Sequence, residues 1–161
     1  MTPNVVAECG RLPSCGHQLA RGFNRVYTQH FLQTLKECAA AKLLHFPGLF
    51  DERCMRQAAT LFQFDDVVTG PQHGFAGADD YWRRASSKPW LNAIRLPTLV
   101  LNALNDPFLP SHALPSSDRV AAAVKLDYPR EGGHVGFVSG RLPGRLDWLS
   151  DRLLHFFQQV R

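Results

Sequence analysis

The apolar positions in the first half of the chain follow helical spacing. Over residues 21–44 they recur at steps of three and four, which places them on one face of a long helix. Asp51 suits the cap of a second helix, because its carboxylate can accept a free amide hydrogen. Proline and glycine predict a turn-rich passage at residues 64–77, before a third helix over 78–86. The same residue types, with two cysteines, predict an irregular segment over 1–20.

The pattern changes to that of strands after residue 96. Residues 97–103 form a nearly continuous apolar run, which is typical of a strand buried on both faces. Residues 124–128 alternate between apolar and polar side chains, which indicates a neighbouring strand nearer the sheet edge. A short helix over 116–123 would join them, and this order forces parallel pairing with a right-handed connection. A terminal helix is predicted with an apolar face made of Leu146, Leu149, Leu153, Leu154, Phe157 and Val160.

Composition adds limits to this α/β pattern. The chain has 161 residues, of which 45% are hydrophobic and 20% charged, so it can bury a core and is not a disordered segment. No stretch reaches the roughly 20 apolar residues of a membrane span, and the first residues do not resemble a signal peptide. Four widely spaced cysteines favour free thiols over a disulfide framework. We therefore expect a cytoplasmic protein.

Charge and metal-ligand patterns are weak. The net charge of +4 comes from lysines and arginines that are scattered along the chain, so a nucleic-acid partner is not expected. Cys9, Cys15 and His17 are the one candidate metal cluster, but they lack a paired C-x-x-C motif and a fourth ligand. We expect neither a metal nor an organic cofactor.

Two chemically active residues follow the two predicted strands. Asp106 comes just after the first strand, and His134 follows the second behind Gly132 and Gly133. Functional groups gather at the carboxyl ends of parallel strands, where a carboxylate can fix the tautomer of an imidazole and stabilise its charged form. In the structural alternative, Asp106 only caps the turn before Pro107 and His134 is an ordinary loop histidine. The residues alone leave both interpretations open.

Asp106 and His134 lie in two distinctive stretches, Leu101–Phe108 and Glu131–Phe137, and further stretches precede them at Arg21–Tyr27, Phe64–Asp66, His73–Phe75, Asp80–Trp82 and Pro97–Leu99. The first two resemble the acid and histidine motifs of YheT-like α/β-hydrolases, relatives of the abhydrolase-domain lipid hydrolases, and the upstream stretches are similar to the same family.

The resemblance implies the C-terminal part of an α/β-hydrolase fold and a carboxylic ester hydrolase of the Ser-His-Asp type, with a small-molecule ester as substrate. It divides the chain into an irregular segment (1–20), a helical lid-like region (21–90) and the C-terminal part of the hydrolase core (91–161). Asp106 and His134 would then be the catalytic acid and base.

The nucleophile of such an enzyme is missing from this sequence. In the family the serine lies on a G-x-S-x-G turn between a strand and a helix, and no such motif occurs here. Ser14 lacks the glycine two residues before it and a buried strand leading to it, and Cys15 lacks the same context. We therefore name no nucleophile and expect the chain alone to be inactive.

Two further questions stay open at this level. His73 lies in the flexible lid-like passage, where it either approaches the substrate or has a purely structural role. The whole chain has an alternative interpretation as a non-catalytic binding or assembly module. An exposed sheet edge beside the strand at 97–103 would favour self-association in either case.

Overall fold

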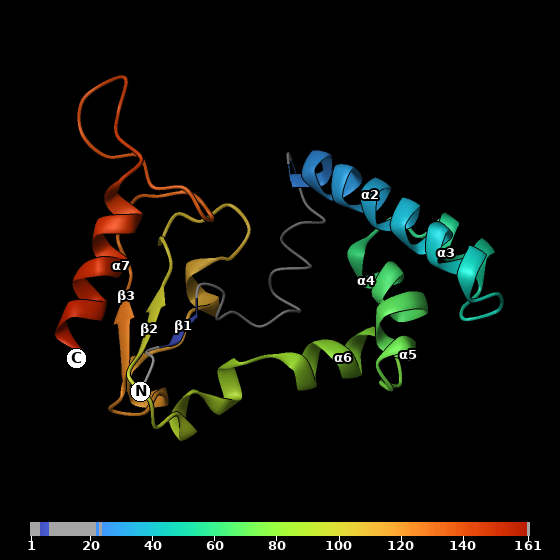
Figure 1. Ribbon diagram of the computed structural model, residues 1–161, viewed down its shortest axis with the longest axis horizontal. Helices are drawn as coiled ribbons and strands as arrows, with labels where there is room; N and C mark the ends of the chain where they lie inside the picture. Colours follow the sequence, from blue (N-terminus) through green and yellow to red (C-terminus); the bar gives the residue numbers. More distant parts are fainter. Residues whose placement is uncertain (1–3, 7–21, 23, 161) are drawn as a thin grey trace. The chain divides into compact units, whose positions relative to one another are not determined.

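The computed structural model describes residues 4–6, 22 and 24–160, and the chain divides into two compact units. The sheet unit consists of Met1–Gly10 and Ser87–Arg161. The helical unit consists of Arg11–Ser86. Each unit has its own hydrophobic cluster, and the elements of both are labelled in Figure 1.

The sheet unit is built on three parallel strands in the order β1, β2, β3 (Figure 1). β2 spans Thr98–Leu101 and β3 spans Val124–Asp127, which confirms the two predicted strands. All four residues of β2 are buried, whereas β3 is buried at Val124 and exposed at Lys125. β2 is therefore the central strand, as the continuous apolar run indicates.

The remaining strand, β1, consists of Asn4–Val6 and differs from the irregular segment predicted over 1–20. It pairs with Thr98–Val100 of β2. Val5 and Val6 are β-branched and favour strands, but a run of three residues is too short for a local pattern to reveal its distant partner. The central strand β2 thus has a neighbour on both edges, contrary to our expectation that one edge lies open.

Two short 3₁₀ turns join β2 to β3 in place of the predicted helix over 116–123. These turns are Ser111–Ala113 and Ser117–Arg119. The second ends early because Val120 packs in the cluster around Leu91, and the amide of Ala121 donates to the carbonyl of Leu91 at 3.0 Å. Tertiary contacts therefore draw this segment out of the helix.

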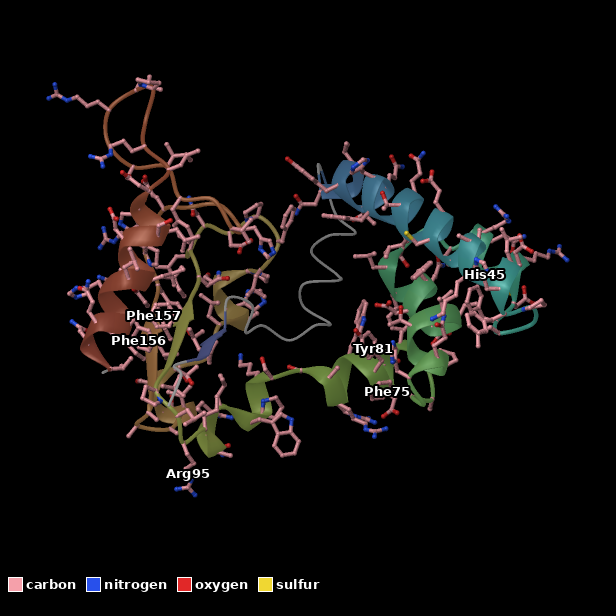
Figure 2. All side chains as sticks on the ribbon, viewed as in Figure 1. His45, Phe75, Tyr81, Arg95, Phe156 and Phe157 are labelled. Atoms are coloured by element: carbon pink, nitrogen blue, oxygen red, sulfur yellow. The ribbon has the colours of Figure 1, made fainter. Side chains whose placement is uncertain are left out.

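The terminal helix α7 (Trp148–Gln159) covers one face of the sheet. Phe156 and Phe157 lie on this helix beside the sheet (Figure 2), and the buried members of the cluster are Leu99, Leu101, Ala103, Phe137 and Phe156. The predicted face is wrong at two positions. Leu146 lies before the helix begins and is 72% exposed, and Leu154 is 58% exposed because the helical spacing places Phe156 against the sheet instead. The opposite face of the sheet carries a cluster of Leu91, Val100 and Val124.

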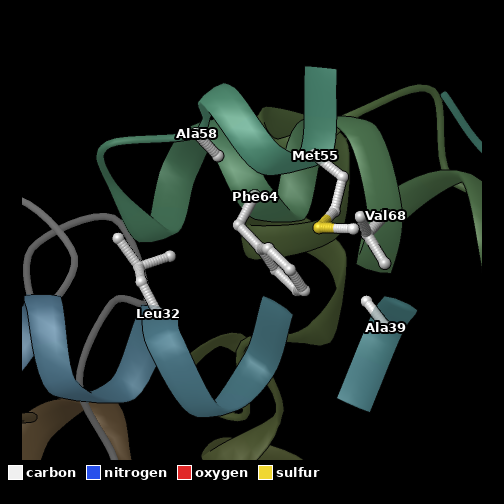
Figure 3. Close-up of a cluster of buried hydrophobic side chains, with 6 residues drawn as sticks. All are labelled: Leu32, Ala39, Met55, Ala58, Phe64 and Val68. Carbon is white, nitrogen blue, oxygen red and sulfur yellow. The ribbon is translucent and has the colours of Figure 1, made fainter. Parts of the chain in front are cut away.

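The helical unit begins with α2 (Asn24–His45), the predicted long helix. α3 (Glu52–Gln57) follows, and the side chain of Asp51 accepts the amide of Cys54 at 2.8 Å, which confirms the predicted cap. The two helices share with α4 (Leu61–Phe64) the cluster in Figure 3, composed of Leu32, Ala39, Met55, Ala58, Phe64 and Val68.

The passage predicted to be turn-rich is helical over most of its length. α4 continues through a π-helical turn, Asp65–Thr69, into α5 (Gly70–Gln72). Pro71 is the second residue of α5, directly after the π-helical turn. The prediction failed because it counted proline and glycine as turn formers without regard to position.

The predicted third helix is confirmed as α6 (Ala78–Ala85), and two acidic side chains hold it against the preceding helices. Asp65 accepts the indole N–H of Trp82 at 2.7 Å, and Asp66 accepts the amide of Ala78 at 2.9 Å. The rings of Phe75 and Tyr81, labelled in Figure 2, have centroids 5.3 Å apart.

Candidate active site

Asp106 lies in the tight turn that follows β2, and its carboxylate is fully buried. Oδ1 accepts the backbone N–H groups of Phe108 at 2.7 Å and Leu109 at 3.1 Å. Pro107 lies between Asp106 and these two donors and has no N–H of its own, so the amides of Phe108 and Leu109 are the first that the following chain offers to the carboxylate. The two bonds fix the orientation of the carboxylate and leave Oδ2 for another partner.

That partner is His134, in the loop after β3. Its Nδ1 lies 3.0 Å from Oδ2 of Asp106, and its side chain is 21% exposed. An ionised carboxylate only accepts hydrogen bonds, so Nδ1 carries the hydrogen, and proton transfer to or from the ring passes through Nε2. The ring of Phe108 meets the imidazole edge to face, with centroids 5.0 Å apart. The carboxylate of Asp106 is thus held by the two amides, and the ring of His134 is held by the carboxylate and by Phe108.

The structure brings the two predicted residues together, and it also shows the capping interaction that was the structural alternative. One oxygen of Asp106 caps the turn while the other binds the histidine. The two interpretations of Asp106 do not exclude each other. A carboxylate has enough lone pairs for both, and the capping bonds aim the second oxygen at the ring.

The conformation of the loop that carries His134 requires glycine at positions where the backbone lies close to other atoms. The amide of Gly133 donates to the carbonyl of Gly136 at 2.6 Å, which closes the loop around the histidine. A side chain on Gly132 would place its Cβ 2.5 Å from the ring of Phe137 and 3.0 Å from Cβ of Ala103. Phe137 is itself fixed by stacking on Trp148, with ring centroids 4.8 Å apart.

We therefore expect Gly132→Ala to destabilise the sheet unit by about 1–3 kcal/mol, because the added methyl group overpacks a site that cannot move freely. Gly136→Ala is the matched control, since nothing lies within 4 Å of the Cβ that it would add. Urea unfolding of the two variants measures the difference. Equal unfolding midpoints would contradict the close packing around Gly132.

Sequence reasoning missed several residues that shape this site. Phe108 and Leu109 supply the amides that hold Asp106, and Asn105 reaches across to the histidine loop. The Asn105-Asp106-Pro107 sequence is a signal for the capping bonds, since both short side chains commonly bind amides in turns. Nothing local in the sequence signals the contact of Asn105 with a loop so far along the chain.

The other candidate residues lie elsewhere. His73 is exposed at the end of α5 in the helical unit, where its amide donates to the carbonyl of Gly70 at 3.2 Å. Ser14, Cys15 and the candidate metal ligands Cys9 and His17 lie outside the described residues. Within the described part of the chain, no group of three potential metal-ligating side chains occurs.

The sequence has relatives among curated proteins. The protein YheT of Escherichia coli, which its name describes as an esterase, is 36% identical over 151 residues, which make up 92% of this chain. Human phospholipase ABHD3 is 30% identical over 91% of the chain, and a monoacylglycerol lipase of Saccharomyces cerevisiae is 29% identical over 91%.

The chain belongs to the YheT-like α/β-hydrolase family. Its parallel sheet and helices agree with the α/β class of these relatives. The chain spans 44% of the length of YheT and 36% of that of human ABHD3, so less than half of either relative is represented.

No family profile matches the chain, and no solved structure is significantly similar to it. Among the helices in the described ranges, none has both the length and the apolar character that a membrane span requires.

Proposed function

We propose that this chain supplies the acid and the base of a serine-type carboxylic ester hydrolase, with Asp106 and His134 in these two roles. The observation that carries the proposal is the 3.0 Å contact between Oδ2 of Asp106 and Nδ1 of His134, at the carboxyl ends of two adjacent parallel strands. A buried carboxylate that orients an imidazole in this way is the arrangement of the aspartate and histidine in a Ser-His-Asp catalytic triad.

The geometry supports the following reaction. His134 takes the proton of a serine hydroxyl through Nε2 while the serine oxygen attacks the ester carbonyl carbon. The imidazolium then returns the proton to the departing alcohol, which leaves an acyl-enzyme. A water molecule, deprotonated by the same histidine, releases the carboxylic acid and restores the serine. Asp106 stabilises the imidazolium in both halves without taking its proton.

The serine in this proposal belongs to the part of the hydrolase that this sequence does not match. The sequence contains no G-x-S-x-G motif, and the relatives are more than twice as long as the matched region. We propose that the chain corresponds to the C-terminal portion of the family fold, with residues 21–90 as a lid-like region and 91–161 as part of the core.

The substrate class follows from the names of the relatives and from the chemistry of the pair. An esterase and a monoacylglycerol lipase both act on carboxylic esters, so we propose a small-molecule ester for the complete enzyme. The steps above use side chains and water, so the proposal calls for no cofactor.

Reconstitution tests this proposal. The chain is co-expressed with the part of E. coli YheT that it does not match, and hydrolysis of short acyl esters is compared with that of the chain alone. We expect activity and fluorophosphonate labelling only in the reconstituted sample, with the label on the YheT serine. Labelling of Ser14 in the chain alone would show instead that this chain has its own nucleophile.

The alternative function, a binding or assembly module, is favoured by exposed strand edges and by exposed apolar side chains in residues 135–154. Within the described residues, β1 and β3 each pair with β2 alone, so an outer edge of both strands has no further strand. Large exposed apolar side chains among residues 135–154 of the sheet unit are Val135, Val138, Leu142, Leu146 and Leu154. Surfaces of this kind favour association.

We therefore expect the purified chain to sediment as dimers or larger species at tens of micromolar. Leu142, with 98% of its surface exposed, is the position to test, and Leu142→Ser should reduce the association without affecting folding. Dispersal by the co-expressed YheT segment would favour an incomplete hydrolase over an independent module. A monomer in sedimentation velocity would contradict the association argument.

A further inference from the structure

The hydrogen-bond ladder between β2 and β3 continues beyond the ends of both strands. The amide of Asn102 donates to the carbonyl of Asp127 at 3.2 Å, and the amide of Leu104 donates to the carbonyl of Pro129 at 2.9 Å. The segment after β2 therefore stays in register with the segment after β3. This register brings the loop of Asp106 beside the loop of His134.

The side chain of Asn105 makes the next contact between the two loops. Its Oδ1 accepts the backbone N–H of Gly132 at 2.9 Å. A backbone N–H is only a donor, so the carbonyl end of the amide must face it. Asn105 precedes Asp106 directly, and Gly132 lies two residues before His134. This bond thus joins the acid loop to the histidine loop immediately beside the acid–base pair.

Gly132 is confined on its other side as well. A Cβ added at Gly132 would lie 2.5 Å from the ring of Phe137 and 3.0 Å from Cβ of Ala103, so no side chain fits there. The bond from Asn105 therefore holds a segment that already has little freedom to move. A single contact between Asp106 and His134 fixes one distance but does not fix the course of the backbone that carries the ring. The hydrogen bond from Gly132 to Asn105 holds that backbone and so restricts the ring further.

We propose that Asn105 is a positioning residue that holds the His134 loop in register with Asp106. This inference rests on the proposed function, because positioning matters to a reaction only if the pair acts as acid and base. Asn105 is exposed, so its side chain contributes little to the buried core, and its effect on the site is separable from an effect on folding. In the competing explanation, Asn105 matters only because it favours the turn before Asp106, and its bond to Gly132 has no effect on His134.

The test compares three variants of the full chain by NMR with labelled histidine. The readout is the Nδ1 proton of His134, which is detectable when its hydrogen bond to Asp106 protects it from exchange. Asn105→Ala removes the acceptor for Gly132, whereas Asn105→Asp retains an acceptor oxygen at that place. Asn92→Ala is the matched control, since Asn92 is also an exposed asparagine of the sheet unit.

We expect the proton signal to persist in Asn105→Asp and Asn92→Ala and to be lost or exchange at least 10-fold faster in Asn105→Ala. Retention of the signal in Asn105→Ala would overturn the proposal. Loss in both Asn105 variants would also overturn it, because the acceptor oxygen would then not be what matters. Urea unfolding of each variant checks that the chain remains folded.

The reconstituted hydrolase provides a separate readout. There Asn105→Ala should lower kcat by about 10- to 100-fold with little change in KM. A displacement of a catalytic group by about 1 Å can slow the reaction about 100-fold, because the group no longer meets the transition state correctly. If reconstitution gives no hydrolysis but the Nδ1 proton of His134 is still lost in Asn105→Ala, the proposed function is wrong and the positioning of the His134 loop by Asn105 is supported. If hydrolysis occurs and Asn105→Ala changes neither readout, the positioning role fails alone.

Discussion

Substitution of His134 by alanine, in a hydrolase reconstituted from this chain and the unmatched part of YheT, is expected to lower kcat for ester hydrolysis by about 10⁶-fold. Without the imidazole, no group takes the serine proton or returns it to the leaving alcohol. Binding of the ester depends on other residues, so KM should change far less. Residual hydrolysis above the rate in water would come from the groups that bind and polarise the ester.

Asp106→Asn should cost about 10⁴-fold in the same assay, for a reason specific to this site. The amides of Phe108 and Leu109 both donate to Oδ1 of Asp106, so the asparagine must turn its carbonyl oxygen toward them. Its NH₂ group then faces Nδ1 of His134 and donates to it. The hydrogen of the neutral ring is thereby forced onto Nε2, where the proposed base needs a lone pair.

The control for both substitutions is His112→Ala, which removes an exposed histidine from the same sheet unit. It should leave kcat within twofold of that of the unmodified chain. Initial rates and fluorophosphonate labelling of the YheT serine measure the effects. If His134→Ala keeps a tenth or more of the activity, His134 is not the base and the proposed function is wrong.

The contact between Asp106 and His134 was predictable from the sequence because it depends on a simple geometric rule. The strands at 97–103 and 124–128 have clear apolar patterns, and parallel neighbours end at the same edge of a sheet. Asp106 and His134 lie in the loops that follow these two strands, so the strand pattern alone predicts that they approach each other. The family motifs then gave the pair a chemical meaning.

The features that escaped prediction depend on contacts between distant parts of the chain. β1 is only three residues long and becomes a strand by pairing with Thr98–Val100. The hydrogen bond between Asn105 and Gly132 likewise joins two loops, and neither loop's local sequence predicts the contact. The helical course of residues 65–72 escaped for another reason, since Asp65 and Asp66 bind α6 and stabilise a segment whose composition suggests turns.

Asp106 has a structural task as well as the proposed chemical one, and stability measurements should separate the two. In Asp106→Ala, the amides of Phe108 and Leu109 lose their acceptor, and Leu109 is buried where water does not easily replace it. Leaving buried donors without partners costs about 1–3 kcal/mol each, so we expect a total loss of about 3 kcal/mol in the free energy of unfolding. Asp106→Asn keeps the carbonyl oxygen that both amides need, so its loss should be about 1 kcal/mol or less.

Urea unfolding of the isolated chain measures this difference, and amide hydrogen exchange at Phe108 and Leu109 locates it. Exchange at both amides should accelerate in Asp106→Ala and stay slow in Asp106→Asn. Asp118→Ala, at an exposed aspartate of the same unit, should leave unfolding unchanged, because exposed ion pairs contribute little. Equal destabilisation by the alanine and asparagine variants would mean that the bond to His134, and not the cap on the turn, is what Asp106 contributes to stability. We expect asparagine to preserve stability and alanine to lower it, although asparagine also slows hydrolysis by the reconstituted enzyme. This pattern would show that one carboxylate oxygen binds the turn and that the other binds the histidine.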